Sequence, residues 1–366
     1  MSRVDAKKFK NFCIILKKHT KGYLMSEAIE RVNEAIEEIK KGKMIIMMDD
    51  EDRENEGDLV YAATFSTPEM VNFMAKEARG LICTPLTKDI ANKLELVPMV
   101  SNNDSNHETA FTISVDSANA TTGISAAERD DCIKKLASPL SKVNDFVRPG
   151  HIFPLIAKDG GVLVRTGHTE GSVDLCKLAG LSPVAVMCEI IKDNGEMARR
   201  DDLEEFKKKH NLKIVYISDI VEYRLANEKL VQKIKEEEIE FFGIKAKKID
   251  FKDHLERIHS VVEFYNTHKN TNVRFHNIGS DVELLLNEKK YNNLIKSIEY
   301  LKRNGGLLIF LDTKIISKEQ AKEFGIGAQI LKELGVESIN LLTSSKETEF
   351  VGLSGFGLNV AKKIVL

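Results

Sequence analysis

The chain has 366 residues, of which 42% are hydrophobic and 30% are charged, and its formal net charge is −2. This composition is typical of a globular protein with an ample core, and the length favours two domains. The near-neutral charge gives no electrostatic reason to expect a nucleic acid or a membrane surface as partner, and no apolar run approaches the ~20 residues that span a bilayer.

The five cysteines, at positions 13, 83, 132, 176 and 188, form no Cys-x-x-Cys pair. An odd number without that spacing indicates free thiols in a reducing compartment, so we expect a cytoplasmic location. Residues 1–24 are basic and lack the apolar core of a secretory signal. We interpret them either as a loosely held extension or as residues before a functional start at Met25, and deleting 2–24 should leave folding and activity intact.

The first regular element is predicted to be a helix that begins after Ser26, its N-cap, and ends at Gly42. A short apolar run at 44–48 then indicates a buried strand. Residues 49–58 are crowded with carboxylates, and a second apolar segment follows at once at 59–63.

This acidic loop has two interpretations. Runs of like charge are usually solvated, so charge alone favours a solvent-exposed loop. Both ends of the loop, however, are tied to core strands, and the repulsion between so many carboxylates needs water, cations or arginine to offset it. A hard divalent cation prefers oxygen ligands, so the loop is also a candidate metal site.

The remaining elements of the first half alternate between helices and strands. We expect helices at 68–78, 126–136, 172–179 and 201–209, strands at 80–83, 111–116, 152–156, 162–164, 184–191 and 213–217, and a polar loop at 101–109. This alternation predicts a three-layer α/β (α+β) domain with a mixed sheet flanked by helices.

Residues 222–253 are dense in Lys and Glu, and we place a domain boundary there. The predicted organisation is an extension over 1–24, a larger domain over 25–222 and a smaller α/β domain over 223–366. In the smaller domain, apolar runs at 307–311 and 338–342 indicate buried strands.

Reactive side chains follow apolar strands at three places in the larger domain: residues 53–58, His151 and residues 165–169. A carboxylate, Glu189, lies inside the otherwise apolar segment 184–191. A lone histidine is more often structural than catalytic, so His151 or His168 alone decides little. Glu189 is more informative, because a buried glutamate is costly unless it is paired, bound to a metal or poised for proton transfer.

Four ordered motifs between residues 26 and 222 closely resemble 3,4-dihydroxy-2-butanone 4-phosphate synthase, which supplies the four-carbon unit of riboflavin. They are Asp-Asp-Glu-Asp-Arg-Glu-Asn-Glu-Gly-Asp (49–58), Thr-Thr-Gly-Ile-Ser-Ala-Ala-Glu-Arg (121–129), Arg-Pro-Gly-His-Ile-Phe-Pro-Leu (148–155) and Arg-Thr-Gly-His-Thr-Glu (165–170). The resemblance implies ribulose 5-phosphate as substrate, formate as co-product, Mg²⁺ (or Mn²⁺) as the metal, and a homodimer with active sites at or near the subunit boundary.

Carried over residue by residue, the resemblance implies that Glu54 and His168 ligate the metal, and that His151 and Glu189 serve the proton transfers. The chemistry needs such groups, because enolising a sugar phosphate removes a proton beside a ketone and develops charge on oxygen. Which carboxylate removes the first proton stays open, and Cys83, at a family position near the substrate, is interpreted as a core residue. The implied substrate-binding residues are Arg53, Glu54, Asp58, Arg165, Thr166, Gly167, His168, Thr169 and Glu189.

The C-terminal half resembles GTP cyclohydrolase II in residues 324–336, 341–343 and 351–358. That family holds a zinc with three cysteines set after a Val-Arg-Val-His strand. Here Val-Arg-Phe-His survives at 273–276, but Asn-Ile-Gly-Ser-Asp follows at 277–281 and no cysteine occurs after Cys188.

Four histidines remain as candidate zinc ligands in this half: His254, His259, His268 and His276. Residues 312–317 also replace the family's Arg-Gln-Glu-Gly-Arg-Gly stretch, so we expect no zinc and no GTP hydrolysis. The leading hypothesis is an enzyme acting on ribulose 5-phosphate with a catalytically silent second domain, and cutting the chain near residue 225 should leave that chemistry largely intact. One alternative is a bifunctional enzyme that also opens GTP; another is a second domain that serves as a scaffold or docks a partner.

Overall fold

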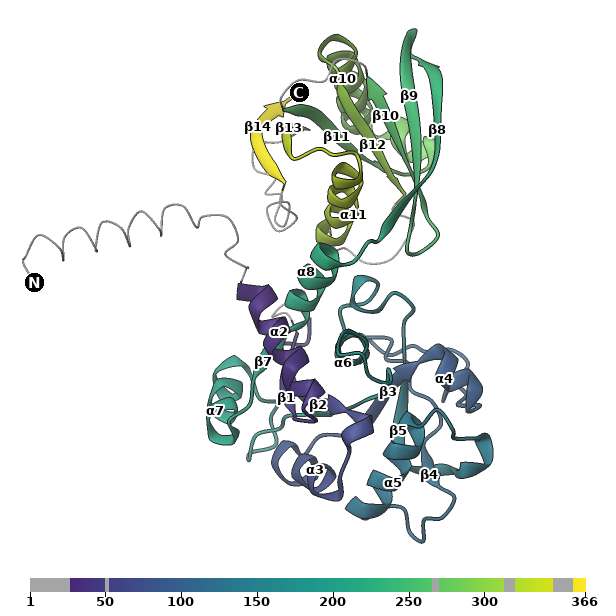
Figure 1. The fold of residues 1–366 in the computed structure, drawn as a ribbon, viewed down its shortest axis with the longest axis vertical. Helices are drawn as coiled ribbons and strands as arrows, with labels where there is room; N and C mark the ends of the chain where they lie inside the picture. The colour runs from purple at the N-terminus through teal and green to yellow at the C-terminus, as the bar shows by residue number, and fades with distance from the viewer. Residues whose placement is uncertain (1–26, 50–52, 265–269, 313–319, 345–357) are drawn as a thin grey trace, which may run out of the picture.

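The fold is described from a computed structural model of the chain. It covers residues 27–49, 53–264, 270–312, 320–344 and 358–366, with 320–325 described by their backbone only. The predicted extension and the N-cap at Ser26 lie outside these ranges. Figure 1 shows two sheet-based halves stacked along the long axis of the molecule, with α8 (Ile217–Asn227) between them.

The first half is built on a seven-stranded mixed sheet in the order β4-β5-β3-β6-β2-β1-β7. Its β1 pairs antiparallel with β2 and parallel with β7, so the predicted mixed sheet is confirmed. The strands are β1 (Ile45–Met48), β2 (Gly57–Ala62), β3 (Cys83–Thr87), β4 (Val115–Ser117), β5 (Phe146–Ala157), β6 (Ala185–Glu189) and β7 (Ile214–Tyr216).

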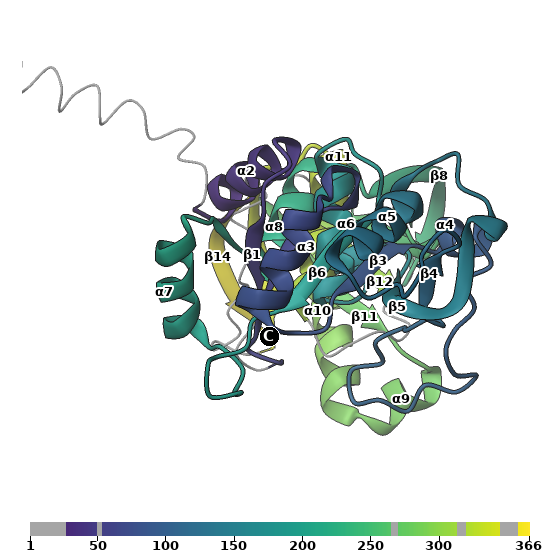
Figure 2. The same cartoon turned by 90° about the horizontal axis from the view of Figure 1, so that it is seen from below.

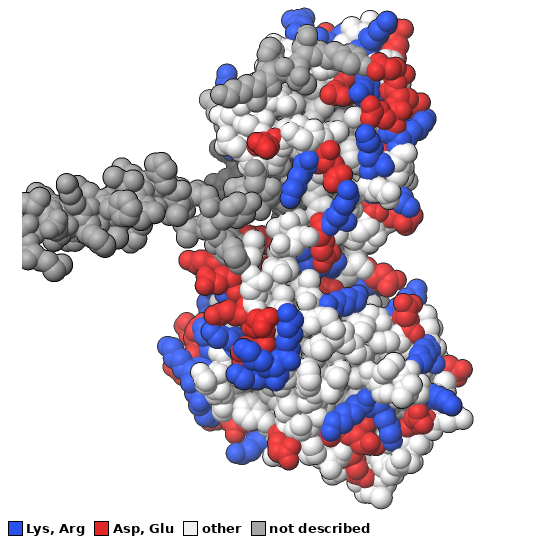
Figure 3. Space-filling model, viewed as in Figure 1, with Lys and Arg blue, Asp and Glu red and all other residues white. Residues whose placement is uncertain are grey.

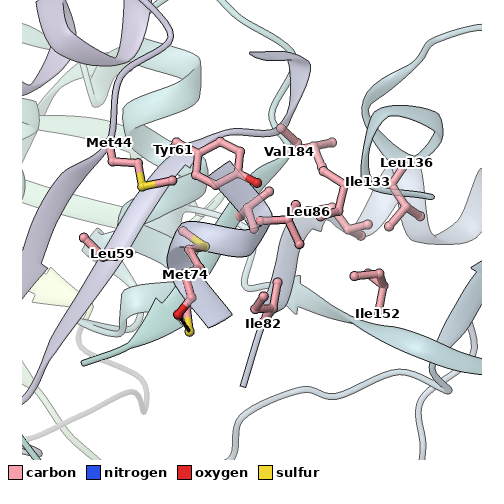
Figure 4. Close-up of a cluster of buried hydrophobic side chains, with 14 of the residues drawn as sticks. Met44, Leu59, Tyr61, Met74, Ile82, Leu86, Ile133, Leu136, Ile152 and Val184 are labelled. Carbon is pink, nitrogen blue, oxygen red and sulfur yellow. Dashed lines mark hydrogen bonds between the residues drawn. The ribbon is translucent and has the colours of Figure 1, made fainter. Parts of the chain in front are cut away.

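Helices cover both faces of this sheet, which gives the predicted three layers (Figure 2). The alternation of β1 decides which side each residue faces: Ile46 and Met48 join one buried cluster, and Ile45 and Met47 join the other. Figure 4 shows the first cluster. The helices are α2 (Glu27–Lys40), α3 (Pro68–Phe73), α4 (Lys88–Lys93), α5 (Ala126–Ala137), α6 (His168–Leu178) and α7 (Arg200–His210).

Two predicted strands are wrong. In the segment 111–116, only Val115 and Asp116 lie in β4, and Phe111 and Thr112 form isolated bridges. The segment predicted at 162–164 contains the 3-10 helix η4 (Gly161–Leu163) instead. The physical reason is the pair of glycines before it: Gly160 and Gly161 both take positive φ, which closes a tight turn that an extended strand cannot make.

Two other elements are longer than predicted, and both carry site residues. Strand β5 begins at Phe146, so His151 lies inside the strand rather than before it. Helix α6 begins at His168 rather than Ser172. The start of β5 was missed because Arg148-Pro149-Gly150 has the composition of a turn, and the start of α6 because its first residues are polar or glycine.

The second half is also a seven-stranded sheet, in the order β14-β13-β11-β12-β10-β9-β8. The buried strands predicted at 307–311 and 338–342 are confirmed. The strands are β8 (Val231–Phe241), β9 (Ile244–Asp253), β10 (Ile258–Phe264), β11 (Thr271–Ile278), β12 (Gly306–Asp312), β13 (Ser338–Thr343) and β14 (Asn359–Val365); the helices are α9 (Asp281–Leu286), α10 (Glu288–Asn304) and α11 (Gln320–Glu333).

The proposed boundary between residues 222 and 223 falls within α8, which runs unbroken to Asn227 before β8 begins at Val231. Acidic and basic side chains are interspersed over the face of the molecule shown in Figure 3. Within the described ranges, every helix is too short or too polar to cross a membrane.

Candidate active site

A pocket of about 260 Å³ opens beside β2, β3, β5 and β6 at the start of α6. Three segments far apart in the chain meet there: the acidic loop, the polar loop that contains His107, and the loop from Arg165 to Thr169. The predicted site residues that line it are Arg53, Glu54, Asp58, Arg165, His168, Thr169 and Glu189. Thr166, Gly167 and His151 do not line it.

Strand pairing brings two carboxylates side by side at the floor of the pocket. Asp58 on β2 is the direct antiparallel partner of Glu189 on β6. Asp58 is 1% exposed. Glu189 was expected to be buried but is only partly so, because it ends its strand and faces the pocket, where its Oε2 accepts a hydrogen bond from Leu81 N at 2.8 Å.

The acidic loop is folded around Asp49, whose carboxylate is 1% exposed. One oxygen accepts from Arg53 Nη1 at 2.8 Å and from Glu54 N at 3.1 Å, and the other accepts from Glu56 N at 2.9 Å. Arginine and backbone amides therefore offset the charge of this carboxylate. Both Asp49 oxygens are engaged in shaping the loop, which aims Glu54 into the pocket.

A cation could be held at the junction of the acidic loop and α6. Asp49, Glu54 and His168 each offer a ligand atom, and these atoms lie within 4.8 Å of one another. His168 Nδ1 is 3.6 Å from Glu54 Oε2, and His168 Nε2 is 3.9 Å from Asp58 Oδ1. These distances exceed a hydrogen bond but leave room for an ion about 2.0–2.2 Å from each ligand.

Two buried polar atoms in this junction are unsatisfied. Among the described residues, His168 Nε2 and Asp58 Oδ1 have no hydrogen-bond partner. A buried polar atom without a partner costs free energy comparable to a lost hydrogen bond, and such atoms often mark a site that a ligand or ion completes. These two atoms lie on the Nε2 side of the His168 ring. On its Nδ1 side the Asp49 oxygens are already used, so His168 Nδ1 and Glu54 Oε2 are the pair that fits a divalent cation best.

The protonation states of these groups are strongly coupled. Burial raises the pKa of Asp58 above its usual range, while His168 opposes this. Burial would lower the pKa of His168, but Asp58 and Glu54 outweigh it and raise that pKa. For Glu54, burial acts upward, yet His168 and Arg53 lower the pKa to about 2. Without a cation, the pocket therefore keeps a proton on His168, in the place that a metal would take.

The start of α6 is arranged to receive an anion. Gly167 is its N-cap, so the amides of the first turn, which begins with His168 and Thr169, lack intrahelical partners. Arg165 is fixed beside them by donating to Glu170 Oε2 at 2.5 Å and to the carbonyl oxygen of His107 at 2.9 Å. A Cβ at Gly167 would collide with Arg165 Nη1, so a side chain there would displace the guanidinium from this position.

His151 lies outside the pocket of its own chain. Its Nδ1 is 2.7 Å from Asp116 Oδ2, and its backbone amide donates to Asp116 Oδ1 at 2.8 Å. Leu155, four residues further along β5, does line the pocket. A strand rises about 3.3 Å per residue, which separates the two positions by roughly 13 Å.

Several pocket residues could not be singled out from the sequence. Glu56 was only one of many carboxylates in the acidic loop, and nothing in the polar loop distinguished His107 or Thr109. Cys83, interpreted from the sequence as a core residue, is buried yet lines the pocket, and burial raises its thiol pKa. The pocket residues that sequence reasoning did not select are Glu56, His107, Thr109, Phe111, Leu155 and Met187.

The histidines of the second half do not gather around a common point. His259 Nε2 is 3.1 Å from Asp253 Oδ2, and its Nδ1 accepts from Asp312 N, so both nitrogens are engaged. His276 packs edge-on against Phe310, and burial lowers its pKa to about 4. Within the described ranges, the only candidate metal group is the one in the first half. His268, residues 313–317 and residues 351–357 lie outside those ranges.

Comparison with known proteins finds one family match in each half of the chain. Residues 33–223 match the family described as 3,4-dihydroxy-2-butanone 4-phosphate synthase, and residues 312–365 match GTP cyclohydrolase II. A protein named 3,4-dihydroxy-2-butanone 4-phosphate synthase from Wolinella succinogenes is 60% identical over 92% of this chain and 97% of its own. The riboflavin biosynthesis protein RibBA of Bacillus cereus is 40% identical over 92% of this chain and 93% of its own.

Two solved structures are informative. RibBX of A. baumannii, described as a two-domain 3,4-dihydroxy-2-butanone 4-phosphate synthase, superposes with a TM-score of 0.77 at 38% identity and covers 92% of this chain and 98% of its own. A 3,4-dihydroxy-2-butanone 4-phosphate synthase crystallised with two magnesium ions is 40% identical, with a TM-score of 0.52, over 54% of this chain and 97% of its own.

Proposed function

The chain belongs to the 3,4-dihydroxy-2-butanone 4-phosphate synthase family, and we propose that the pocket at the start of α6 is where it converts ribulose 5-phosphate, with release of formate. The chain is an enzyme of riboflavin biosynthesis. The observation that carries the proposal is the convergence of the acidic loop, the Asp58–Glu189 pair and the α6 N-terminus on one pocket.

Glu54 and His168 are the residues we propose as metal ligands, for Mg²⁺ or Mn²⁺. The crystallisation of a relative with two magnesium ions supports a divalent metal. Mg²⁺ commonly uses one or two protein ligands and leaves its other positions to water and substrate, which suits this small ligand set. When bound, the ion supplies Lewis-acid stabilisation of the charge that develops as the sugar enolises.

The phosphate of the substrate would lie against the first turn of α6. The free amides there, the Thr169 hydroxyl and the guanidinium of Arg165 form a cluster of donors suited to a phosphate. The hydrogen bonds from Arg165 to Glu170 and His107 hold its fork in place before substrate arrives. Arg53 and Asp58 complete the substrate-binding surface, together with the Thr166–Gly167 backbone that shapes the turn.

Proton transfers need groups that exchange protons near neutral pH. Glu189 reaches the pocket from β6, beside Asp58, whose pKa burial raises. His151 is oriented by Asp116 through Nδ1, and its side chain is 43% exposed. A histidine held by a carboxylate in this way is suited to act as a general acid or base.

Because His151 lies roughly 13 Å along the strand from the pocket lining, we propose a homodimer in which His151 of the partner subunit completes each site. Exposed apolar residues beside His151 support an interface there. Ile124, next to the glycine that packs on the imidazole, is 55% exposed, and Val147 on the same strand is 49% exposed.

We propose that the second half does not hydrolyse GTP and binds no zinc, since no thiolate follows Cys188 and the described histidines are spread apart. A bifunctional enzyme remains the alternative, and the match to GTP cyclohydrolase II over 312–365 is what favours it. A cytoplasmic location fits the free thiols. One experiment tests the assignment: formate is measured from ribulose 5-phosphate and from GTP with the same preparation, and its bound metals are analysed.

A further inference from the structure

The two halves meet at the turn that leads into the substrate loop. Leu163 of η4 belongs by sequence to the first half, yet it packs in the buried cluster of the second half with Leu225, Leu230 and Phe251. Two residues later the chain reaches Arg165, whose amide donates to the carbonyl oxygen of Gly161. The turn that the second half covers and the proposed phosphate loop are therefore one continuous piece of backbone.

A buried ion pair ties this turn to both α6 and α8. Asp174, one to two turns after His168 on α6, accepts from Val162 N and from Arg224 Nη1, each at 2.8 Å. Its side chain is 3% exposed. Arg224 on α8 also donates to the carbonyl oxygen of Gly160 at 2.8 Å. One guanidinium thus fixes both the turn before the substrate loop and the helix after it.

The other side of Arg224 faces the second half. Its Nε and Nη2 donate to the two carboxylate oxygens of Glu228, at 2.7 and 2.8 Å. Gln329 on α11, 7% exposed, donates to the carbonyl oxygens of Leu225 and Glu228 at 2.7 Å and accepts from Leu230 N at 2.7 Å. Figure 1 shows α11 meeting the end of α8, with α6 beside it.

We propose that the second half positions the substrate and metal loop (residues 165–169) through Gln329, Arg224 and Asp174. The relay runs from α11 to α6 through the end of α8: Gln329 binds backbone groups of Leu225 and Glu228, and Arg224 of the same helix binds Asp174. Leu163 anchors the same turn by burial. They are positioning residues, since none of them lines the pocket. The second half, silent toward GTP in the proposed function, would then have a role in the synthase reaction.

This inference rests on the proposed function and changes one expectation drawn from the sequence. A chain cut near residue 225 was expected to keep its chemistry largely intact. Such a cut would remove Glu228 and Gln329 and expose Leu163, so we now expect it to loosen the loop. A cut chain can also misfold, and side-chain variants of the full-length protein are therefore the sharper test.

The variant Gln329→Ala removes the contacts between α11 and α8 without touching the pocket. Its matched control is Lys229→Ala, which breaks the Lys229–Glu333 ion pair at the same junction, where the two side chains are 66% and 33% exposed. Hydrogen exchange is measured on the metal-free full-length proteins, at a temperature below the onset of unfolding of either variant. We expect Gln329→Ala to exchange the amides of 161–169 about tenfold faster, the shift that corresponds to one lost hydrogen bond, and Lys229→Ala to match the parent.

The same variants are assayed for KM and kcat with ribulose 5-phosphate. Loss of positioning should raise KM severalfold in Gln329→Ala and leave Lys229→Ala unchanged. If Gln329→Ala does not fold, Arg224→Lys, which keeps the charge but loses the fork, replaces it with the same expected direction. Faster exchange confined to 225–230 and 326–333, with 161–169 unchanged, would overturn the inference. Exchange needs no substrate, so a parent protein that releases no formate refutes the proposed function and leaves the relay to be judged separately.

Discussion

Replacing Glu54 with glutamine tests the metal site with the smallest change in shape. The side chain keeps its size, but the charge that lies 3.6 Å from His168 and 2.8 Å from Arg53 is lost. Arg53 then presents its positive charge to the pocket with one partner fewer. Both effects disfavour a cation between Glu54 and His168.

The magnitude is taken from a pair of unit charges, because desolvation offsets much of the closer attraction between the ion and its ligand. Two unit charges about 4 Å apart interact by about 4 kcal/mol at an effective dielectric constant of 20, which corresponds to a factor of about 1,000 in affinity. The amide oxygen remains a weak ligand, so we expect the Kd for Mg²⁺ or Mn²⁺ to rise about 100- to 1,000-fold. Formate release from ribulose 5-phosphate should fall with it at a fixed metal concentration.

Calorimetric titration with Mn²⁺ measures this change, and the thermal transition confirms that the variant is folded. Glu34→Gln is the control, since it makes the same charge change in an exposed pair with Lys213. Such surface pairs contribute little, so this control should bind metal like the parent. A folded Glu54→Gln protein that binds Mn²⁺ within threefold of the parent would refute the assignment of Glu54.

Three further predictions follow from the same geometry. The carboxylates beside His168 raise its pKa, so the metal-free imidazole holds a proton at neutral pH. Binding of Mn²⁺ should release this proton, and the affinity for Mn²⁺ should therefore rise with pH. Calorimetry in buffers of different ionisation enthalpy should find about one proton released. Affinity independent of pH near neutrality would count against His168 as a ligand. Mixing inactive His151→Ala and Glu54→Ala proteins should restore part of the activity through shared sites, whereas a monomeric, active parent would exclude the dimer. Purified protein should contain no stoichiometric zinc and should not turn over GTP, and turnover on the order of 1 s⁻¹ would establish the bifunctional alternative.

The sequence was most informative where the residues of the site lie close together in one continuous motif. The acidic loop and the 165–169 loop carry unusual residues in long ordered motifs, and the structure brings Glu54 and His168 to one pocket. The apolar runs that flank the acidic loop predicted β1 and β2 because buried strands have a simple pattern.

Other features depend on tertiary structure that no local pattern contains. Nothing in the sequence says that Asp58 and Glu189 are strand partners, because register is decided by the assembled sheet. The position of His151 away from its own pocket follows from the course of β5. Two adjacent glycines turned an apolar run into η4, and only the assembled fold shows that Leu163 in this turn is buried by the second half.

The central claim is that the pocket beside α6 converts ribulose 5-phosphate with a bound divalent metal. The most direct test is formate release from ribulose 5-phosphate by the full-length protein after treatment with EDTA, and again after Mg²⁺ is restored. We predict that activity is lost on chelation and regained with Mg²⁺. Full activity in excess EDTA, from protein shown to retain no metal, would contradict the account.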